Sequence, residues 1–183
     1  MKGKMLLGLT AILMLTGAAV PVKADDVWKF DAQRFVLKEY TGTETDVVVP
    51  DTMDEGVPVK RLGTQLLAGS ETLTSVVVPD SVTILDVGAL SYDNNLSEIT
   101  LSSNLINIGW NAISSNDALT ELTIPASVCI IDSYAVSGCY ALKKIVFEGA
   151  CPLIGSEAFV MLSDDVVIYV PDDQIEEYKK VFE

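Results

Sequence analysis

Histidine is absent from this chain of 183 residues, and Lys and Arg together number only 12. Without His, the conventional Ser–His and Cys–His nucleophiles and a common zinc ligand are missing. The basic residues are outnumbered by 26 Asp and Glu, which gives a net charge of −14. Such a surface repels phosphate backbones and anionic lipid headgroups. We therefore expect no nucleic-acid binding and no attachment to anionic membranes.

Motifs for cofactors are missing as well. The sequence contains no Gly-rich phosphate loop and no dinucleotide fingerprint. The acidic pairs at 25–26, 54–55 and 164–165 lack the alternating ligands and the glycine of a calcium loop, so we interpret them as solvated loop charge. We expect no cofactor, no metal site and no catalytic residue.

Cysteine is scarce, with three residues at Cys129, Cys139 and Cys151. An odd number cannot form a closed disulfide framework, and no two of them have the close spacing of zinc ligands. The favoured interpretation is that they are free thiols that pack as small apolar side chains. A bridge between Cys139 and Cys151 is the alternative.

Long apolar runs are scarce too, and the one that matters lies at the N-terminus, from Met5 to Leu15. A membrane span needs about 20 apolar residues, so this run is too short for an anchor. Residues 1–24 have the layout of a secretory signal peptide, with Val22 and Ala24 at cleavage-site positions. We predict an exported chain that begins near Asp25 and is not inserted in the membrane after cleavage. A membrane anchor or a buried first helix is the alternative.

The rest of the sequence repeats with a period of 23 residues. Independent columns in one phase indicate a repeat fold in which neighbouring copies share a core. The columns are Leu73, Leu96, Leu119 and Leu142; Leu62, Leu85, Ile108, Ile131 and Ile154; Ala89, Ala112, Ala135 and Ala158; and Pro79, Ser102, Pro125, Glu148 and Pro171.

Each repeat also contains the pattern Leu-x-x-apolar-x-apolar, as in Leu96, Ile99 and Leu101. The last two apolar residues are two positions apart, which is the period of a strand that buries one face. Proline after the strand ends the pairing because it has no N–H to donate. The chain then turns, buries the Leu/Ile column and returns through a brief helical or irregular segment. We predict an α/β repeat solenoid with parallel strands.

Several segments of the repeat resemble the BspA-like leucine-rich repeats. The resemblance lies in Val78–Val82, Ile124–Val128 and Ser137–Cys139, together with an Ala-apolar pair in each repeat. The sequence departs from the family in this Ala-apolar pair, because the Phe that usually follows the Ala occurs only at Phe159. The core is therefore expected to be lined by smaller aliphatic side chains.

The resemblance extends to both ends of the chain and covers about residues 35–180. It implies a surface or secreted protein that acts as a binding module. Segments 40–42, 49–52 and 56–59 look like the family's opening module, and segments 168–171 and 178–179 look like its closing segment.

Both ends of the repeats are expected to be caps, because the terminal cores would otherwise be open to water. We divide the mature chain into an N-terminal cap with the first strands (25–61), leucine-rich repeats (62–165), and a last strand with a capping helix (166–183). The N-terminal cap is expected to contain a strand pair built from Trp28, Phe30, Phe35, Leu37 and Val47–Val49, and a loop near Met53–Pro58.

The C-terminal cap is predicted to be a short helix from Gln174 to Phe182. Asp172 or Asp173 is expected to N-cap it, since a carboxylate can accept hydrogen bonds from the first free N–H groups. Ile175, Tyr178 and Phe182 would share one side of this helix.

One polar column is interpreted as structural. It lies at an inward turn, where polar side chains satisfy backbone groups that the bend leaves unpaired. Its members are Ser70, Asp93, Asn116, Cys139 and Leu162.

The outward side of the strands is the candidate binding surface, and two columns should line it. Neighbouring strands lie about 4.7–4.9 Å apart, so Glu98 and Glu121 should be adjacent carboxylates. This spacing is close to the roughly 5 Å between the two acids of a retaining glycosidase, although no aromatic sugar platform accompanies it. The columns are Ser75, Glu98, Glu121, Lys144 and Val167, and beside them Val77, Thr100, Thr123, Val146 and Tyr169.

A mixture of charged, Thr, Val and Tyr side chains suits a protein surface better than a small molecule that needs a pocket. We expect a non-enzymatic module that binds an extracellular or host protein. A cell-envelope scaffold, or less favoured a carbohydrate-binding protein, is the alternative. Trp110 on the convex side is an additional candidate for the contact. The predicted ligand-binding residues are Glu98, Thr100, Glu121, Thr123, Lys144 and Tyr169.

Overall fold

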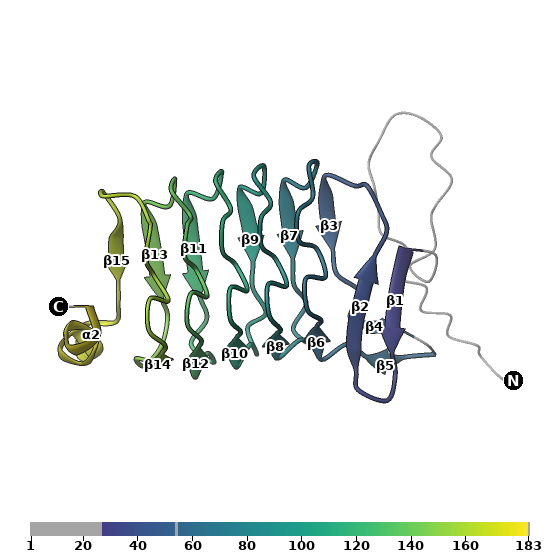
Figure 1. The fold of residues 1–183 in the computed structure, drawn as a ribbon. Helices are drawn as coiled ribbons and strands as arrows, with labels where there is room; N and C mark the ends of the chain where they lie inside the picture. Colours follow the sequence, from purple (N-terminus) through teal and green to yellow (C-terminus); the bar gives the residue numbers. More distant parts are fainter. Residues whose placement is uncertain (1–26, 54, 183) are drawn as a thin grey trace, which may run out of the picture.

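The computed structural model describes residues 27–53 and 55–182, which form an elongated solenoid (Figure 1). Successive turns of the chain stack along one axis, with the N-terminal hairpin at one end and a helix at the other. The predicted signal peptide and the predicted start near Asp25 lie outside the described residues. No helix in the described part of the chain is both long and apolar enough to cross a membrane.

The first ladder of the solenoid contains the strands that the repeat pattern predicted. Pairing is parallel, and partners such as Ser75 and Glu98 are 23 residues apart, as the repeat requires. The prediction that the Leu-x-x-apolar-x-apolar pattern forms a short strand in each repeat is therefore confirmed. The strands are β3 (Asp46–Val48), β7 (Ser75–Val77), β9 (Glu98–Thr100), β11 (Glu121–Ile124), β13 (Lys144–Phe147) and β15 (Val167–Tyr169).

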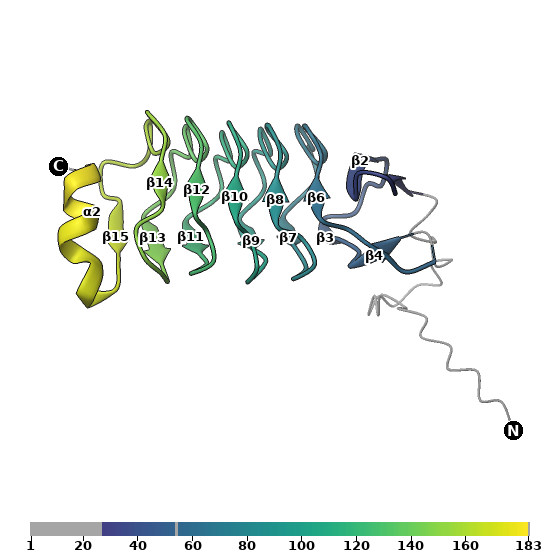
Figure 2. The ribbon, with the colours of Figure 1, turned by 90° about the horizontal axis from the view of Figure 1, so that it is seen from below.

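A second ladder runs along the solenoid beside the first (Figure 2). Its strands lie at the Leu/Ile column, where no strand was predicted, whereas the return that carries the Ala-apolar pair is irregular, as expected. Each of its repeat strands is two residues long, with the second residue in the Leu/Ile column. The strands are β6 (Arg61–Leu62), β8 (Ile84–Leu85), β10 (Asn107–Ile108), β12 (Ile130–Ile131) and β14 (Leu153–Ile154).

The core lies between the two ladders and the turns that connect them. Side chains of the leucine and alanine columns are buried, and Leu62, Leu85, Ile108 and Ile131 have no exposed surface. Each such Leu or Ile stabilises the fold by about 1.5–3 kcal/mol. Because every repeat supplies one layer, the core continues from the N-terminal hairpin to the last strand.

The polar column forms a hydrogen-bonded ladder inside the turns, as predicted. The N–H of Ser70 donates to Oδ1 of Asp93 at 2.6 Å, and the N–H of Asp93 donates to Oδ1 of Asn116 at 3.0 Å. Nδ2 of Asn116 donates to the carbonyls of Leu90 and Ile113 at 2.8 and 3.0 Å. Side chains from one repeat thus satisfy the backbone of its neighbour.

All three cysteines are free thiols, so the alternative bridge between Cys139 and Cys151 is not formed. Cys139 is buried in the polar column, and its Sγ lies 3.2 Å from the carbonyl oxygen of Ile113. Burial raises the pKa of the Cys139 thiol to about 11, which keeps it in the unreactive protonated form.

The N-terminal cap is a hairpin followed by a small excursion. Strands β1 (Trp28–Asp31) and β2 (Val36–Tyr40) pair antiparallel, and β2 also pairs with β6, the first repeat strand of the second ladder. The segment near Met53–Pro58, expected to be a loop, contains the short strands β4 (Thr52–Met53) and β5 (Val57–Pro58). The hairpin thereby covers the first layer of the core.

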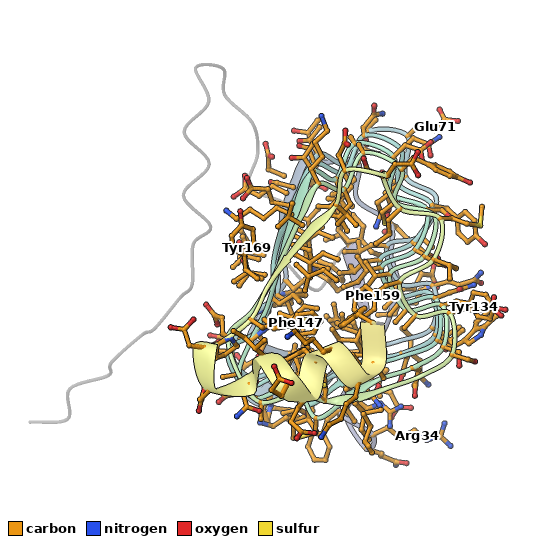
Figure 3. The ribbon with its side chains drawn as sticks, turned by 90° about the vertical axis from the view of Figure 1, so that its left-hand side faces the viewer. Arg34, Glu71, Tyr134, Phe147, Phe159 and Tyr169 are labelled. Atoms are coloured by element: carbon orange, nitrogen blue, oxygen red, sulfur yellow. The ribbon has the colours of Figure 1, made fainter. Side chains whose placement is uncertain are left out.

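The C-terminal cap is a 3-10 turn, η1 (Asp172–Gln174), that leads into α2 (Ile175–Phe182), close to the predicted boundary. The predicted side-chain N-cap is wrong. Pro171 precedes the turn without a capping side-chain bond, and Asp172 and Asp173 lie within the first turn. Figure 3 shows α2 lying across the end of the solenoid below Phe147 and Phe159. The ring of Tyr178 packs 4.8 Å from that of Phe147 and closes the core.

Candidate functional site

The candidate site is the strand face, by which we mean the outward surface of β3, β7, β9, β11, β13 and β15. The pairing confirms the predicted columns within each sheet: Glu121 lies opposite Lys144, and Val146 opposite Tyr169. All six predicted ligand-binding residues lie on this face, on strands β9, β11, β13 and β15. Three or four residues per strand place two outward columns side by side.

At the N-terminal end of the strand face, hydrogen bonds from within the chain stabilise the charged carboxylate of Asp46. Asp46 on β3 accepts bonds from the hydroxyls of Ser75 at 2.6 Å and Thr74 at 3.1 Å. These bonds, with one from Thr45, hold the pKa of Asp46 below its ordinary value. The carboxylate of Asp46 is therefore already solvated by its own repeats.

The C-terminal end of the strand face combines one cation with an aromatic ring. Nζ of Lys144 lies 3.0 Å from Oε2 of Glu121 and 6.0 Å from the centre of the Tyr169 ring. The structure thus brings together three of the predicted residues. Because both charged side chains are exposed, the pair contributes little to stability and is free to exchange partners.

Between these ends the first ladder is interrupted. Strand β9 pairs with β7 and β11 pairs with β13, but the two strands belong to separate sheets (Figure 1). The strand pairing on which the expected spacing of Glu98 and Glu121 rests is therefore not formed. Glu98 and Glu121 are successive residues of one outward column, and both are negatively charged. Like charges on opposite residues destabilise strand pairing.

Backbone hydrogen bonds define the interruption. The carbonyl of Thr74 accepts bonds from the N–H groups of Ser97 and Glu98, at 2.9 and 3.3 Å. The carbonyl of Thr120 likewise accepts two bonds from the next repeat. Ser97 occupies the equivalent position between them, and within the described part of the chain its carbonyl accepts no bond from Thr120 or Glu121.

A hollow opens where the pairing is lost, and we call it the slot. It has a volume of about 530 Å³ and is lined by Ser97–Thr100, Thr120, Glu121 and Thr123. The slot reaches the core: Ile99 in its wall is 9% exposed, whereas its counterpart Val76 is fully buried. Four of the predicted residues therefore line one concavity, together with Ser97 and Thr120, which sequence reasoning missed.

The slot lies in a strongly acidic part of the chain. Residues 62–142 contain eight Asp and Glu and no Lys or Arg. Among the described residues, no ion pair or side-chain hydrogen bond engages the carboxylate of Glu98. The absence of Lys and Arg from residues 62–142 is readable in the sequence, and it is the signal that could have identified this segment as a candidate site.

A second hollow, of about 720 Å³, lies at the N-terminal cap beside Arg34, Lys38 and Arg61. Its cations are largely engaged within the fold, since Lys38 pairs with Asp31 at 2.7 Å and Arg61 pairs with Asp86. The strand face remains the candidate site because the carboxylate of Glu98 forms no ion pair with the described residues.

Trp110 does not extend the strand face. Its ring contacts that of Tyr134 with centres 6.3 Å apart. Tyr134 and Tyr169 lie on opposite sides of the cross-section in Figure 3. A single flat partner that covers the strand face would therefore not reach Trp110. In the described part of the chain, no group of three or more Asp, Glu or Cys side chains is placed to hold a metal ion.

Two parallel ladders that share one core at a 23-residue period define a leucine-rich-repeat solenoid. The chain belongs to the BspA type leucine rich repeat family, whose sequence model matches residues 60–182 as six copies. Leucine-rich repeats of this kind are generally non-catalytic binding modules.

Solved structures agree with this assignment. A leucine-rich repeat protein from Bacteroides capillosus is 34% identical, with 67% of this chain and 93% of that chain covered and a TM-score of 0.57. The T. pallidum leucine rich repeat protein is 22% identical, covers 88% and 96% of the two chains, and has a TM-score of 0.55. The pneumococcal vaccine antigen PcpA is 17% identical, covers 87% and 46%, and has a TM-score of 0.65. The last two show the fold alone. A search of curated protein sequences finds no significant match.

Proposed function

We propose that the protein is an exported binding module whose strand face contacts an extracellular or host protein. The observation that carries this proposal is the strand face itself, which presents two columns of mixed side chains that the described elements leave uncovered. Tyr169 is 51% exposed at one end of this surface, and Glu98 is exposed near its middle. Exposed Tyr side chains are enriched in protein interfaces.

The strand face suits a protein partner better than the second ladder does. The second ladder has strands of two residues, so each repeat offers one outward side chain. The strand face offers two per repeat, and they include an engaged cation, a free carboxylate and an aromatic ring. We propose that it binds without catalysis, because its carboxylates are exposed and the chain lacks His.

Export and a position at the cell surface belong to the same proposal. They are supported by the signal-like residues 1–24 and by membership of the BspA type family. In this setting the 26 Asp and Glu, all of which lie after residue 24, favour partners that present basic surfaces.

The proposal is tested with a partner isolated from extracellular-matrix or cell-surface proteins. We expect the double substitution Glu121→Arg with Tyr169→Ala to weaken binding of that partner by about tenfold or more, because it reverses a charge and removes an aromatic anchor. Affinity is measured by surface plasmon resonance. Both residues are exposed, so the free energy of unfolding should change by less than about 1 kcal/mol.

A matched control is Glu71→Arg with Tyr140→Ala, which makes the same chemical changes in one exposed turn column. Figure 3 shows Glu71 away from Tyr169. We expect the control to bind like the parent. Equal weakening by both double variants would mean that overall charge governs binding, and unchanged affinity in the strand-face variant would exclude this surface. Failure to isolate any partner in repeated trials would favour the scaffold alternative.

A further inference from the structure

We propose that the slot between β9 and β11 binds a Lys or Arg side chain from a basic, extended segment of the partner protein. This inference rests on the proposed function and identifies the chemistry of its central contact. The occupant follows from three features of the described residues: unpaired backbone groups, an unengaged carboxylate and a long acidic stretch without cations.

The unpaired backbone groups are the first feature. In the flanking repeats the carbonyls of Thr74 and Thr120 each accept two N–H groups from the next strand. The equivalent carbonyl of Ser97 accepts none from the described residues and lies in the wall of the slot. A backbone carbonyl is an acceptor only, so it is satisfied by a donor such as an ammonium or guanidinium group.

The carboxylates are the second feature. Glu98 and Glu121 both line the slot, and Glu98 forms no ion pair with the described residues. Glu121 is paired with Lys144 at 3.0 Å, but this contact is exposed and exchanges at little cost. A cation between the two strands would be shared by both carboxylates and would relieve the repulsion between them.

Selectivity for a basic protein segment follows from the surroundings. Residues 62–142 contain no Lys or Arg, so the cation that competes for the slot is Lys144, through its exposed pair with Glu121. The eight Asp and Glu of this stretch attract cationic partners to it. The hydroxyls of Thr100 and Thr123 stand beside the slot and can hydrogen-bond to the backbone of the segment that carries the cation. An anionic or neutral ligand would leave the carboxylates unpaired.

The test uses a short synthetic peptide of alternating Lys and Val, added to the mature protein at about 0.15 M salt to screen long-range attraction. We expect amide chemical shifts to change first in Ser97–Leu101 and Thr120–Thr123. Glu98→Gln should lower the affinity about tenfold, which is the size of one charge-assisted hydrogen bond. The same peptide acetylated at each lysine should not bind.

The matched control is Glu71→Gln, which removes one negative charge at an exposed position outside the slot. We expect less than about a twofold loss of affinity, since a remote exposed charge is mostly screened. Equal losses in the two variants, shifts spread over other repeats, binding of the acetylated peptide, or no binding at all would each overturn the slot proposal. These results would leave strand-face binding of a partner intact, whereas a partner that contacts another surface would overturn the proposed function even if the slot binds lysine.

Discussion

Among single residues, Asp93 has an environment with a direct consequence for stability. Its side chain is completely buried in the turn column; Oδ1 accepts the N–H of Ser70 at 2.6 Å, whereas Oδ2 has no partner in the described structure. Burial raises the pKa of Asp93 to about 7, and the backbone bonds from Ser70 and Gly69 oppose the rise only in part. In the neighbouring repeat, Oδ1 of Asn116 accepts the equivalent bond from the N–H of Asp93, and its uncharged Nδ2 donates to two backbone carbonyls.

The raised pKa makes the fold more stable in acid with respect to this group. Its contribution is fully present below the unfolded pKa of 3.8 and is lost as the pH rises through about 7. We expect Asp93→Asn to stabilise the protein at pH 8 by roughly 2–4 kcal/mol and to have little effect near pH 4. Urea unfolding at the two pH values measures the difference.

The control for this prediction is Asp117→Asn, because Asp117 is exposed in the next turn and carries the same charge. It corrects for the general repulsion in a chain with a net charge of −14. If Asp93→Asn and Asp117→Asn gave the same change at pH 8, the buried carboxylate would not be the cause.

The sequence predicted the role of the polar column but not the backbone of the turns around it. Two positions in every repeat have a left-handed backbone, which residues other than Gly, Asn and Asp rarely adopt. Most of these positions are not glycine, so no residue type identifies them in the sequence. The positions of the turns could therefore be predicted, but their backbone conformation could not. The positions are Gln65, Gly88, Asn111, Tyr134 and Glu157, and Gly69, Tyr92, Ser115, Gly138 and Met161.

At the scale of the elements, β12 provides a direct test of the register. Its two residues face opposite ways: Ile131 is fully buried and Ile130 is 36% exposed. We expect Ile131→Asp to cost several kcal/mol because it places an unpaired charge in the central core, against a total stability of about 5–15 kcal/mol. Thermal unfolding followed by circular dichroism measures the loss.

Ile130→Asp is the matched control, since it introduces the same charge into the same strand on the outward side. Its effect should be within about 1 kcal/mol of the parent. An Ile131→Asp variant that melts like the parent or like the control would show that the register of the second ladder is wrong.

The strands of the first ladder were predicted from the sequence and those of the second ladder were not, because the two sets differ in length. Strands β7, β9, β11 and β13 alternate buried and outward residues over three or four positions, and this period is readable in the sequence. The second ladder has two residues per strand, which is too short for a period to be recognised. Its buried column was predicted correctly, but the hydrogen bonding of its backbone was not.

At the scale of the whole molecule, repetition explains both the success and the main error of the sequence analysis. A common period fixes which side chains share a face, so the six predicted binding residues were placed on one surface. The same assumption made every strand gap equivalent. Ser97–Leu101 fits the repeat pattern, so the interruption beside it depends on the interaction between repeats and not on either repeat alone.

The central claim is that a partner protein contacts the strand face, and site-specific photo-crosslinking tests it most directly. A photoreactive residue is placed at Thr123 on the strand face and, in a separate variant, at Asn107 on the second ladder. Both positions face outward from their strands. Crosslinked products with the isolated partner are identified by mass spectrometry. We predict crosslinks from position 123 and few or none from position 107. Crosslinks from position 107 with none from position 123 would contradict the account.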